Sequence, residues 1–161
     1  MSLTNSIKLT ISGELAEKIR KHAAETYPHE CCGALLGRDV MSNENRPGSR
    51  EVLDCLPLTN RRDDSPRNRY SVAPLDVVDA DRVSQARGMN LIGWYHSHPD
   101  HPARPSAYDR DYAWPWYSYV IVSVHSGVPK EMTSWRLNDD RAEYSQETIE
   151  VCSVTNVQSP V

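Results

Sequence analysis

The sequence contains no phenylalanine, so its aromatic residues, 7% of the chain, are all tryptophan or tyrosine. It also lacks any apolar run that approaches the length of a membrane span. The first residues show no basic segment followed by an apolar stretch, which is the pattern of a secretory signal. These absences argue against export and against a helical membrane protein. We therefore expect a cytoplasmic protein with no membrane partner.

Cysteine is scarce and is not arranged in metal-binding or disulfide-forming pairs. The four cysteines lie at positions 31, 32, 55 and 152, with no CxxC spacing among them. The adjacent Cys31 and Cys32 cannot bond to each other without strain. We expect buried free thiols. The alternative, a thiol nucleophile assisted by His29, is disfavoured because Cys31 and Cys32 begin a strongly apolar segment.

The chain has no excess of positive charge. Its formal net charge is -4, which argues against a nucleic-acid partner, although Arg61, Arg62, Arg67 and Arg69 leave a local basic patch open. A length of 161 residues fits one ordinary domain, and no repeat, linker or low-complexity segment suggests a second one. We expect a domain over residues 1–151 and a C-terminal tail over residues 152–161.

The apolar pattern alternates between strand and helix periods, which predicts an α/β fold. A helix is expected from Glu14 to about Thr26, capped by Ser12 and stopped by Pro28. A second helix is expected from Pro74 to about Gly88, with one face formed by Leu75, Val78, Val83 and Ala86. Residues 39–49 and 60–68 are expected to be a polar turn and an exposed loop. Strands are expected at residues 7–11, 32–36, 52–58, 91–95, 117–124, 131–137 and 143–151.

Two histidines and an aspartate follow the central expected strand. Residues two apart in a strand point to the same side, so His96 and His98 can share one ion. Ser106 can cap a short helix that carries Asp109 in its first turns. Three ligands are one fewer than the closed shell of a structural zinc site, which favours an open, catalytic metal site. If the histidine pair is considered alone, the alternative is that His96 and His98 are hydrogen-bonded polar residues at the end of a strand and bind no metal.

Hydrolysis at such a metal also needs a base that stays outside the ligand shell. Glu30 is the candidate, because it lies just past a helix end and at the beginning of an apolar strand. The alternative is an exposed loop glutamate. Ser106 is equally well explained as a plain helix cap. His101, in the proline-rich loop, is expected to be a solvated residue rather than a ligand.

These residues carry a family resemblance. Glu30 lies within PHECCGALLG, and His96 and His98 are followed after seven residues by Ser106 and after two more by Asp109. This pattern resembles the signature of the JAMM (MPN-domain) zinc metalloproteases, and the order of elements from Ile7 to about Leu137 is similar as well. The resemblance implies a single domain with a mixed β-sheet flanked by helices, of the cytidine-deaminase-like type. It also implies one zinc ion per chain.

The resemblance also implies roles and a substrate class. His96, His98 and Asp109 would bind the zinc, Glu30 would activate the attacking water, and Ser106 would donate a hydrogen bond to the oxyanion. The chain resembles the compact prokaryotic members, and family activity is hydrolysis of peptide or isopeptide bonds. We therefore expect cleavage at the Gly-Gly tail of a ubiquitin-like or sulfur-carrier protein. The alternatives are a non-catalytic module that binds such a tail and a metal-dependent amidase acting on a cell-wall-type peptide.

Overall fold

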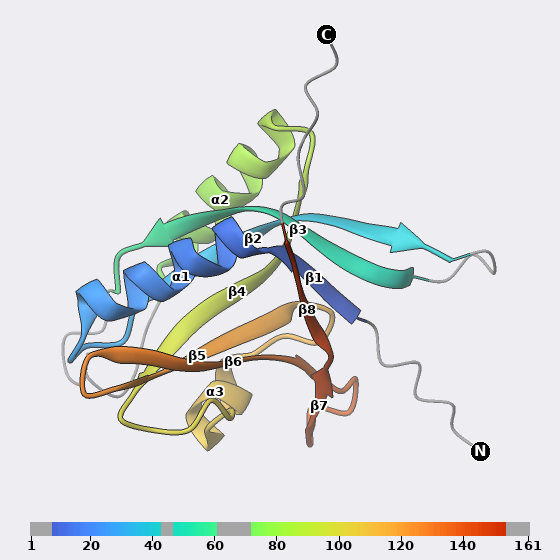
Figure 1. Cartoon of the computed structure of the whole chain (residues 1–161). Coiled ribbons are helices and arrows are strands. Elements are labelled where there is room, and N and C mark those ends of the chain that lie inside the picture. The colour runs from blue at the N-terminus through green and yellow to red at the C-terminus, as the bar shows by residue number, and fades with distance from the viewer. Residues whose placement is uncertain (1–7, 43–46, 61–71, 154–161) are drawn as a thin grey trace, which may run out of the picture.

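The computed structural model describes residues 8–42, 47–60 and 72–153. Within them the chain forms eight strands and three helices (Figure 1). In chain order the elements are β1 (Lys8–Ser12), α1 (Gly13–Thr26), β2 (Cys32–Met41), β3 (Pro47–Leu58), α2 (Pro74–Ala86), β4 (Asn90–Pro99), α3 (Ala107–Tyr112), β5 (Ser118–His125), β6 (Val128–Leu137), β7 (Tyr144–Glu147) and β8 (Ile149–Cys152).

All eight strands belong to one mixed sheet. Their order is β7-β6-β5-β4-β2-β3-β1-β8, with β1 parallel to β3 and β8, β4 parallel to β5, and the other neighbours antiparallel. The two outermost strands, β7 and β8, are separated in sequence only by Thr148. The sheet is therefore so strongly curled that one chain segment supplies both of its edges (Figure 1).

The helices cover opposite faces of the curled sheet. α1 packs through Ala16, Ile19 and Ala23 into a core cluster that contains Leu35 and Tyr95. A second core cluster contains side chains from the other face of β2 and β4, together with Ala80 of α2 and with Ala113, which follows α3. None of the helices in the described ranges is both long and apolar enough to cross a membrane. The predicted mixed sheet flanked by helices is confirmed.

Several predicted boundaries are wrong, because pairing between strands extends elements beyond their apolar stretches. β2 continues to Met41 and β3 begins at Pro47, so much of the expected turn at residues 39–49 is strand. β4 runs through both histidines to Pro99. The strand expected over 143–151 is two strands, because its halves pair with β6 and with β1. Residues 61–68 of the expected loop lie outside the described residues, as do all four arginines of the possible basic patch, Arg61, Arg62, Arg67 and Arg69.

The expected apolar face of α2 is also wrong except at Val83, which packs against the second core cluster. Leu75 and Val78 are 75% and 51% exposed, whereas the helix buries Ala80 and Ser84. Polar residues interrupt the apolar pattern of this helix, so the sequence alone does not show which side of the helix is buried. α1, by contrast, has the predicted Ser12 cap, whose Oγ accepts a hydrogen bond from the Leu15 amide at 3.1 Å.

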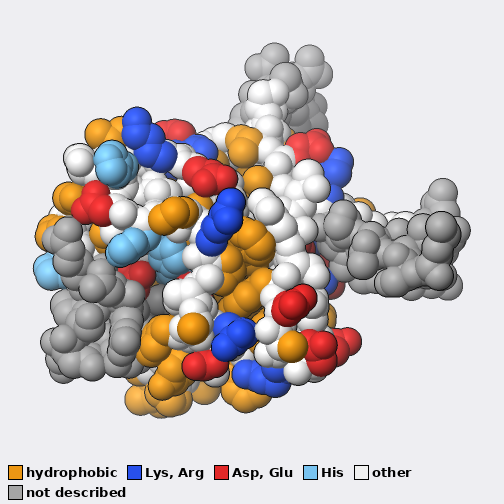
Figure 2. Space-filling model, turned by 90° about the horizontal axis from the view of Figure 1, so that it is seen from below, with side chains coloured by type: hydrophobic (Ala, Val, Ile, Leu, Met, Phe, Trp, Pro, Cys, Tyr) orange, Lys and Arg blue, Asp and Glu red, His pale blue; other side chains and the backbone are white. Residues whose placement is uncertain are grey.

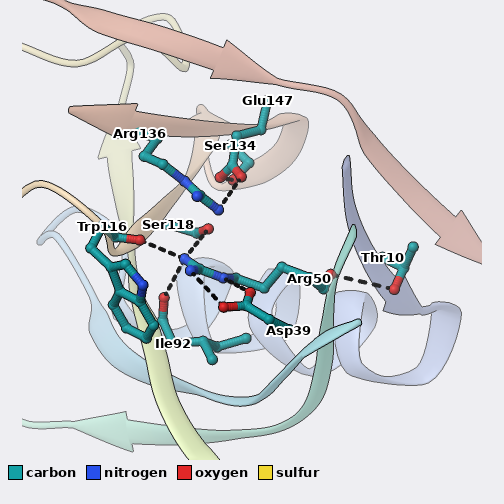
Figure 3. A network of polar contacts seen from close by, with 9 residues as sticks. All are labelled: Thr10, Asp39, Arg50, Ile92, Trp116, Ser118, Ser134, Arg136 and Glu147. Atoms are coloured by element: carbon teal, nitrogen blue, oxygen red, sulfur yellow. Dashed lines mark hydrogen bonds and ion pairs between the residues drawn. The ribbon is translucent and has the colours of Figure 1, made fainter. Parts of the chain in front are cut away.

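A buried arginine joins several strands inside the fold (Figure 3). Arg50 of β3 is 0% exposed, and its guanidinium donates to Asp39 on β2 at 2.8 Å. It also donates to the Ile92 carbonyl at 3.1 Å, the Trp116 carbonyl at 2.6 Å and the Ser118 Oγ at 3.1 Å. These bonds tie β3 to the beginning of β4 and to the turn that enters β5. Because a buried charge must be paired, the whole network depends on this one cation.

Replacing Arg50 by methionine should lower the free energy of unfolding by about 3 kcal/mol, because it leaves Asp39 and two carbonyls without their donor. The matched control is Arg38→Met, since Arg38 has a 63% exposed side chain paired with Glu51. Arg38→Met should lower the free energy of unfolding by less than about 1 kcal/mol. Urea denaturation measures both. Equal losses in the two variants would contradict the structural role given to Arg50.

Candidate active site

The two histidines of β4 point to one face of the sheet together with Trp94, while Tyr95 and Ser97 point to the other, as the period of a strand requires. His96 and His98 are 1% and 7% exposed. Their Nε2 atoms are 3.1 Å apart. The predicted placement of the pair on one side of a strand therefore agrees with the structure.

Asp109 completes a three-donor cluster. Its Oδ2 lies 3.2 Å from His98 Nε2 and 3.4 Å from His96 Nε2. Donors bound to a tetrahedral zinc at roughly 2.0–2.2 Å lie about 3.4 Å from one another. The three donor atoms thus already have the spacing of three corners of such a shell, and the residues present fit a zinc ion. These are also the three residues that the sequence assigned as ligands.

The protonation states of the cluster suit a cation. Burial lowers the pKa of His96, which keeps its imidazole neutral. Burial disfavours the charged form of Asp109, but the two neighbouring imidazoles outweigh it and hold the pKa of this carboxyl below its usual range. His98 Nδ1 lies 2.8 Å from the Pro102 carbonyl, which can only accept. Nδ1 therefore carries the proton, and Nε2 has a lone pair for a metal.

Asp109 is held by the start of α3. Ser106 is the N-cap, and its Oγ accepts from the Asp109 amide at 3.0 Å. The Ser106 amide donates to Asp109 Oδ2 at 2.8 Å, which completes a reciprocal capping box. The same carboxylate oxygen thus faces both the cap and the histidines. Ser106 itself is exposed, and the predicted cap is confirmed.

Glu30 reaches the histidines through the pairing of β2 with β4. Cys32 pairs with His96, and the Ser97 amide donates to the Cys31 carbonyl at 3.2 Å. In return, the Cys31 amide donates to Ser97 Oγ at 2.8 Å. Glu30 immediately precedes this double link and is only 3% exposed. The alternative of an exposed loop glutamate is therefore wrong.

One cavity has both Glu30, the candidate base, and His98 of the three-donor cluster in its wall. It has a volume of about 300 Å³ and is lined by Glu30, His98, His101, Pro102, Arg104 and Ser106. Figure 2 shows histidine side chains gathered toward one side of a molecular face, with acidic side chains among them. The fold has thus brought Glu30, Ser106 and a metal-cluster histidine to the same small space.

The loop between β4 and α3 is fastened at several points that sequence reasoning did not identify. Asp100 accepts from the Tyr27 hydroxyl at 2.7 Å and from the Ser126 amide at 2.8 Å. Further along, the His101 carbonyl accepts from Ser123 Oγ at 2.7 Å and the Ala103 carbonyl from Thr133 Oγ1 at 2.6 Å. The only sequence signal for this fastening was the loop's prolines, which indicate stiffness and not partners. His101 is exposed, as expected.

The thiol alternative is not supported by the structure. Cys31 and Cys32 are 1% and 0% exposed. Burial raises the pKa of each thiol to about 12, so both stay protonated near neutral pH. Cys31, Cys32 and Cys55 are buried free thiols, as the sequence predicted, whereas the prediction is wrong for Cys152, which is exposed at the end of the edge strand β8.

Comparison with known proteins agrees with this geometry. The family model Prok-JAB, prokaryotic homologs of the JAB domain, matches residues 12–138. The chain belongs to this family. The JAMM/MPN membership and the fold class predicted from the sequence are thereby confirmed. The roles of the individual site residues stay predictions.

Two relatives and one solved structure illustrate the similarity. The desampylase of Haloferax volcanii is 32% identical over 123 residues, which cover 73% of this chain and 82% of that protein. A Thermus thermophilus protein named as a probable TtuB-protein conjugate cleaving protease is 32% identical over 120 residues, which cover 74% of this chain and 73% of that protein. The solution structure of a Desulfitobacterium hafniense protein superposes with a TM-score of 0.74 at 31% identity, covering 90% of this chain and 93% of the other.

Replacing Asp109 by alanine should abolish stoichiometric zinc binding, because it removes one of three donors from the cluster. Asp111→Ala is the matched control, since Asp111 is an exposed aspartate on the same helix. Purified variants can be compared by elemental analysis after equilibration with zinc. Retention of one zinc per chain in Asp109→Ala would contradict the ligand assignment.

Ser97→Ala should lower the free energy of unfolding by roughly 1–3 kcal/mol, because the buried Cys31 amide loses its acceptor. The zinc content should stay at one per chain, since Ser97 points away from the cluster. Ser123→Ala, which removes a more exposed hydroxyl, should cost less than about 1 kcal/mol. Urea denaturation measures the loss of stability, and elemental analysis measures the zinc content. A Ser97→Ala protein that binds no zinc would contradict the placement of Ser97 away from the cluster.

Proposed function

We propose that this chain is a zinc-dependent peptidase that cleaves a peptide or isopeptide bond at the C-terminal tail of a ubiquitin-like or sulfur-carrier protein. The observation that carries the proposal is the shared cavity, whose wall contains both the buried Glu30 and His98 of the His96, His98 and Asp109 cluster. The names of two relatives, a desampylase and a conjugate cleaving protease, support cleavage of protein conjugates as the reaction class.

A zinc ion bound by His96, His98 and Asp109 would polarise the scissile carbonyl and make a water molecule more acidic. Glu30 then takes a proton from the attacking water as its oxygen bonds to the carbonyl carbon. The same carboxyl passes the proton to the leaving nitrogen as the carbon–nitrogen bond breaks. Burial of Glu30 in the cavity wall keeps it aimed at the reacting atoms.

Ser106 can donate a hydrogen bond to the substrate while it remains the N-cap of α3. Its Oγ accepts from the Asp109 amide, which leaves the hydroxyl hydrogen available to a group in the cavity. Donation to the carbonyl oxygen would stabilise the negative charge that develops there. Loss of one such donor typically slows an enzyme about a hundredfold to a thousandfold. The cap and the oxyanion donor are therefore compatible roles of one side chain.

The proposal is tested with a sulfur-carrier protein extended beyond its Gly-Gly sequence. Zinc-loaded protein should convert it to the mature Gly-Gly form, as followed by mass spectrometry. Glu30→Gln should reduce turnover at least roughly a thousandfold, because no group then accepts the proton from water, while zinc stays bound. Glu25→Gln, an exposed position on α1, serves as the control.

Two outcomes would contradict the proposal. A zinc-loaded protein that leaves extended carriers and generic peptides intact, yet binds the Gly-Gly tail, would be the non-catalytic module instead. Equal turnover in the wild type and Glu30→Gln would refute the proton-transfer role of Glu30, even if cleavage occurred.

A further inference from the structure

One hydrogen bond beside the site has no part in the proposed mechanism. The Tyr27 hydroxyl donates to Asp100 Oδ2 at 2.7 Å, across 73 positions of sequence. Tyr27 lies three residues before Glu30, and Asp100 lies two residues after His98. The bond therefore joins the segment that carries the proposed base to the segment that carries a proposed metal ligand.

The same two segments are joined a second time on the other side of Glu30. The Cys31 amide donates to Ser97 Oγ at 2.8 Å, and the Ser97 amide donates to the Cys31 carbonyl at 3.2 Å. The two links close a ring of chain made of residues 27–31 and 97–100, which we call the base–ligand ring. The proposed base lies in one half of this ring and the ligand histidine in the other, so their separation depends on both links.

Both ends of the bond between Tyr27 and Asp100 belong to firmly held parts of the fold. Tyr27 is the C-cap of α1, where its amide donates to the Ala23 carbonyl at 3.2 Å, and it packs against the core cluster beneath this helix. Asp100 is held at β5, because its amide donates to the Val124 carbonyl at 2.7 Å and its Oδ1 accepts from the Ser126 amide at 2.8 Å. The bond thus connects α1 to the end of β5 and can impose a fixed spacing on the ring.

A general base works only at a fixed distance from the reacting atoms, because a displacement of about 1 Å can slow a reaction about a hundredfold. We propose that Tyr27 and Asp100 are positioning residues, whose hydrogen bond holds Glu30 at its working distance from the three-donor cluster. Neither of the two side chains lines the cavity, so they act through the base–ligand ring. This inference rests on the proposed function for its effect on the rate.

Tyr27→Phe removes the hydroxyl and keeps the packed aromatic ring. In the zinc-loaded protein this change should lower kcat for an extended carrier by about tenfold to a hundredfold, the loss expected for a misplaced base. KM and the zinc content should stay as in the wild type, because the lost hydroxyl lies outside the cavity wall and the metal cluster. Tyr112→Phe is the matched control, since Tyr112 is an exposed tyrosine of α3, and it should change neither kcat nor KM.

The other partner of the bond supplies a rescue. Asp100→Asn keeps an oxygen for the Ser126 amide, and its side-chain nitrogen can donate to the Tyr27 oxygen. Asparagine also tolerates the left-handed backbone of this position, where φ is 58°. Asp100→Asn should therefore keep a higher kcat than Tyr27→Phe, because the cross-link survives in a neutral form.

A double-mutant cycle separates positioning of the base from a general loosening of the structure. If Tyr27 acts through Glu30, adding Tyr27→Phe to Glu30→Gln should slow the residual cleavage no further, because the base that it positions is already absent. An equal fractional loss of kcat in the two backgrounds would overturn the inference. A wild-type kcat in Tyr27→Phe would overturn it as well.

Hydrogen–deuterium exchange supplies a readout that does not need turnover. The amides of residues 29–31 should exchange faster in Tyr27→Phe than in the wild type or in Tyr112→Phe, because one link of the base–ligand ring is open. Exchange at the wild-type rate would overturn the inference while leaving the proposed function intact. Faster exchange in Tyr27→Phe, combined with a wild type that cleaves no extended carrier, would overturn the proposed function and would support the closure of the ring without a catalytic task.

Discussion

The pairing of β2 with β4 is the constraint on which the site depends. It places Cys32 opposite His96 and is reinforced where Cys31 and Ser97 exchange two hydrogen bonds across 66 positions of sequence. Glu30 is thereby fixed at the same cavity as His98, a proposed metal ligand that belongs to a distant segment of the chain. A slip of one residue would turn His96 and His98 toward α1 and remove them from the cavity, because the side-chain period of a strand is two.

The rest of the site is attached to this pair of strands by short polar links. Asp109 is oriented by the Ser106 capping box, and His98 by the Pro102 carbonyl. The loop that joins them is fastened to α1 through Tyr27 and to the neighbouring strands β5 and β6. The proposed metal donors and the proposed base are therefore held in place by the protein itself, which is the condition for electrostatic preorganisation.

Much of the site was predictable because its signals are local. The spacing of His96, His98, Ser106 and Asp109 follows from one strand, one loop and one capped helix, and each has a recognisable sequence pattern. The position of Glu30 at the beginning of an apolar strand made it a candidate base, but only the family motif connected it to the histidines. The predictions that failed depend on contacts between segments that are far apart in the sequence. The splitting of residues 143–151 between opposite sheet edges, and the buried side of α2, depend on partners that the segment itself does not encode.

The most direct test of the account is a crystal structure of the zinc-loaded protein with anomalous data at the zinc edge. We predict one peak per chain, bound by Nε2 of His96, Nε2 of His98 and Oδ2 of Asp109. The Glu30 carboxylate should face the fourth coordination position without binding the ion. Zinc at another place, or coordination by Glu30 itself, would contradict the separation of ligands from base on which the proposed function is built.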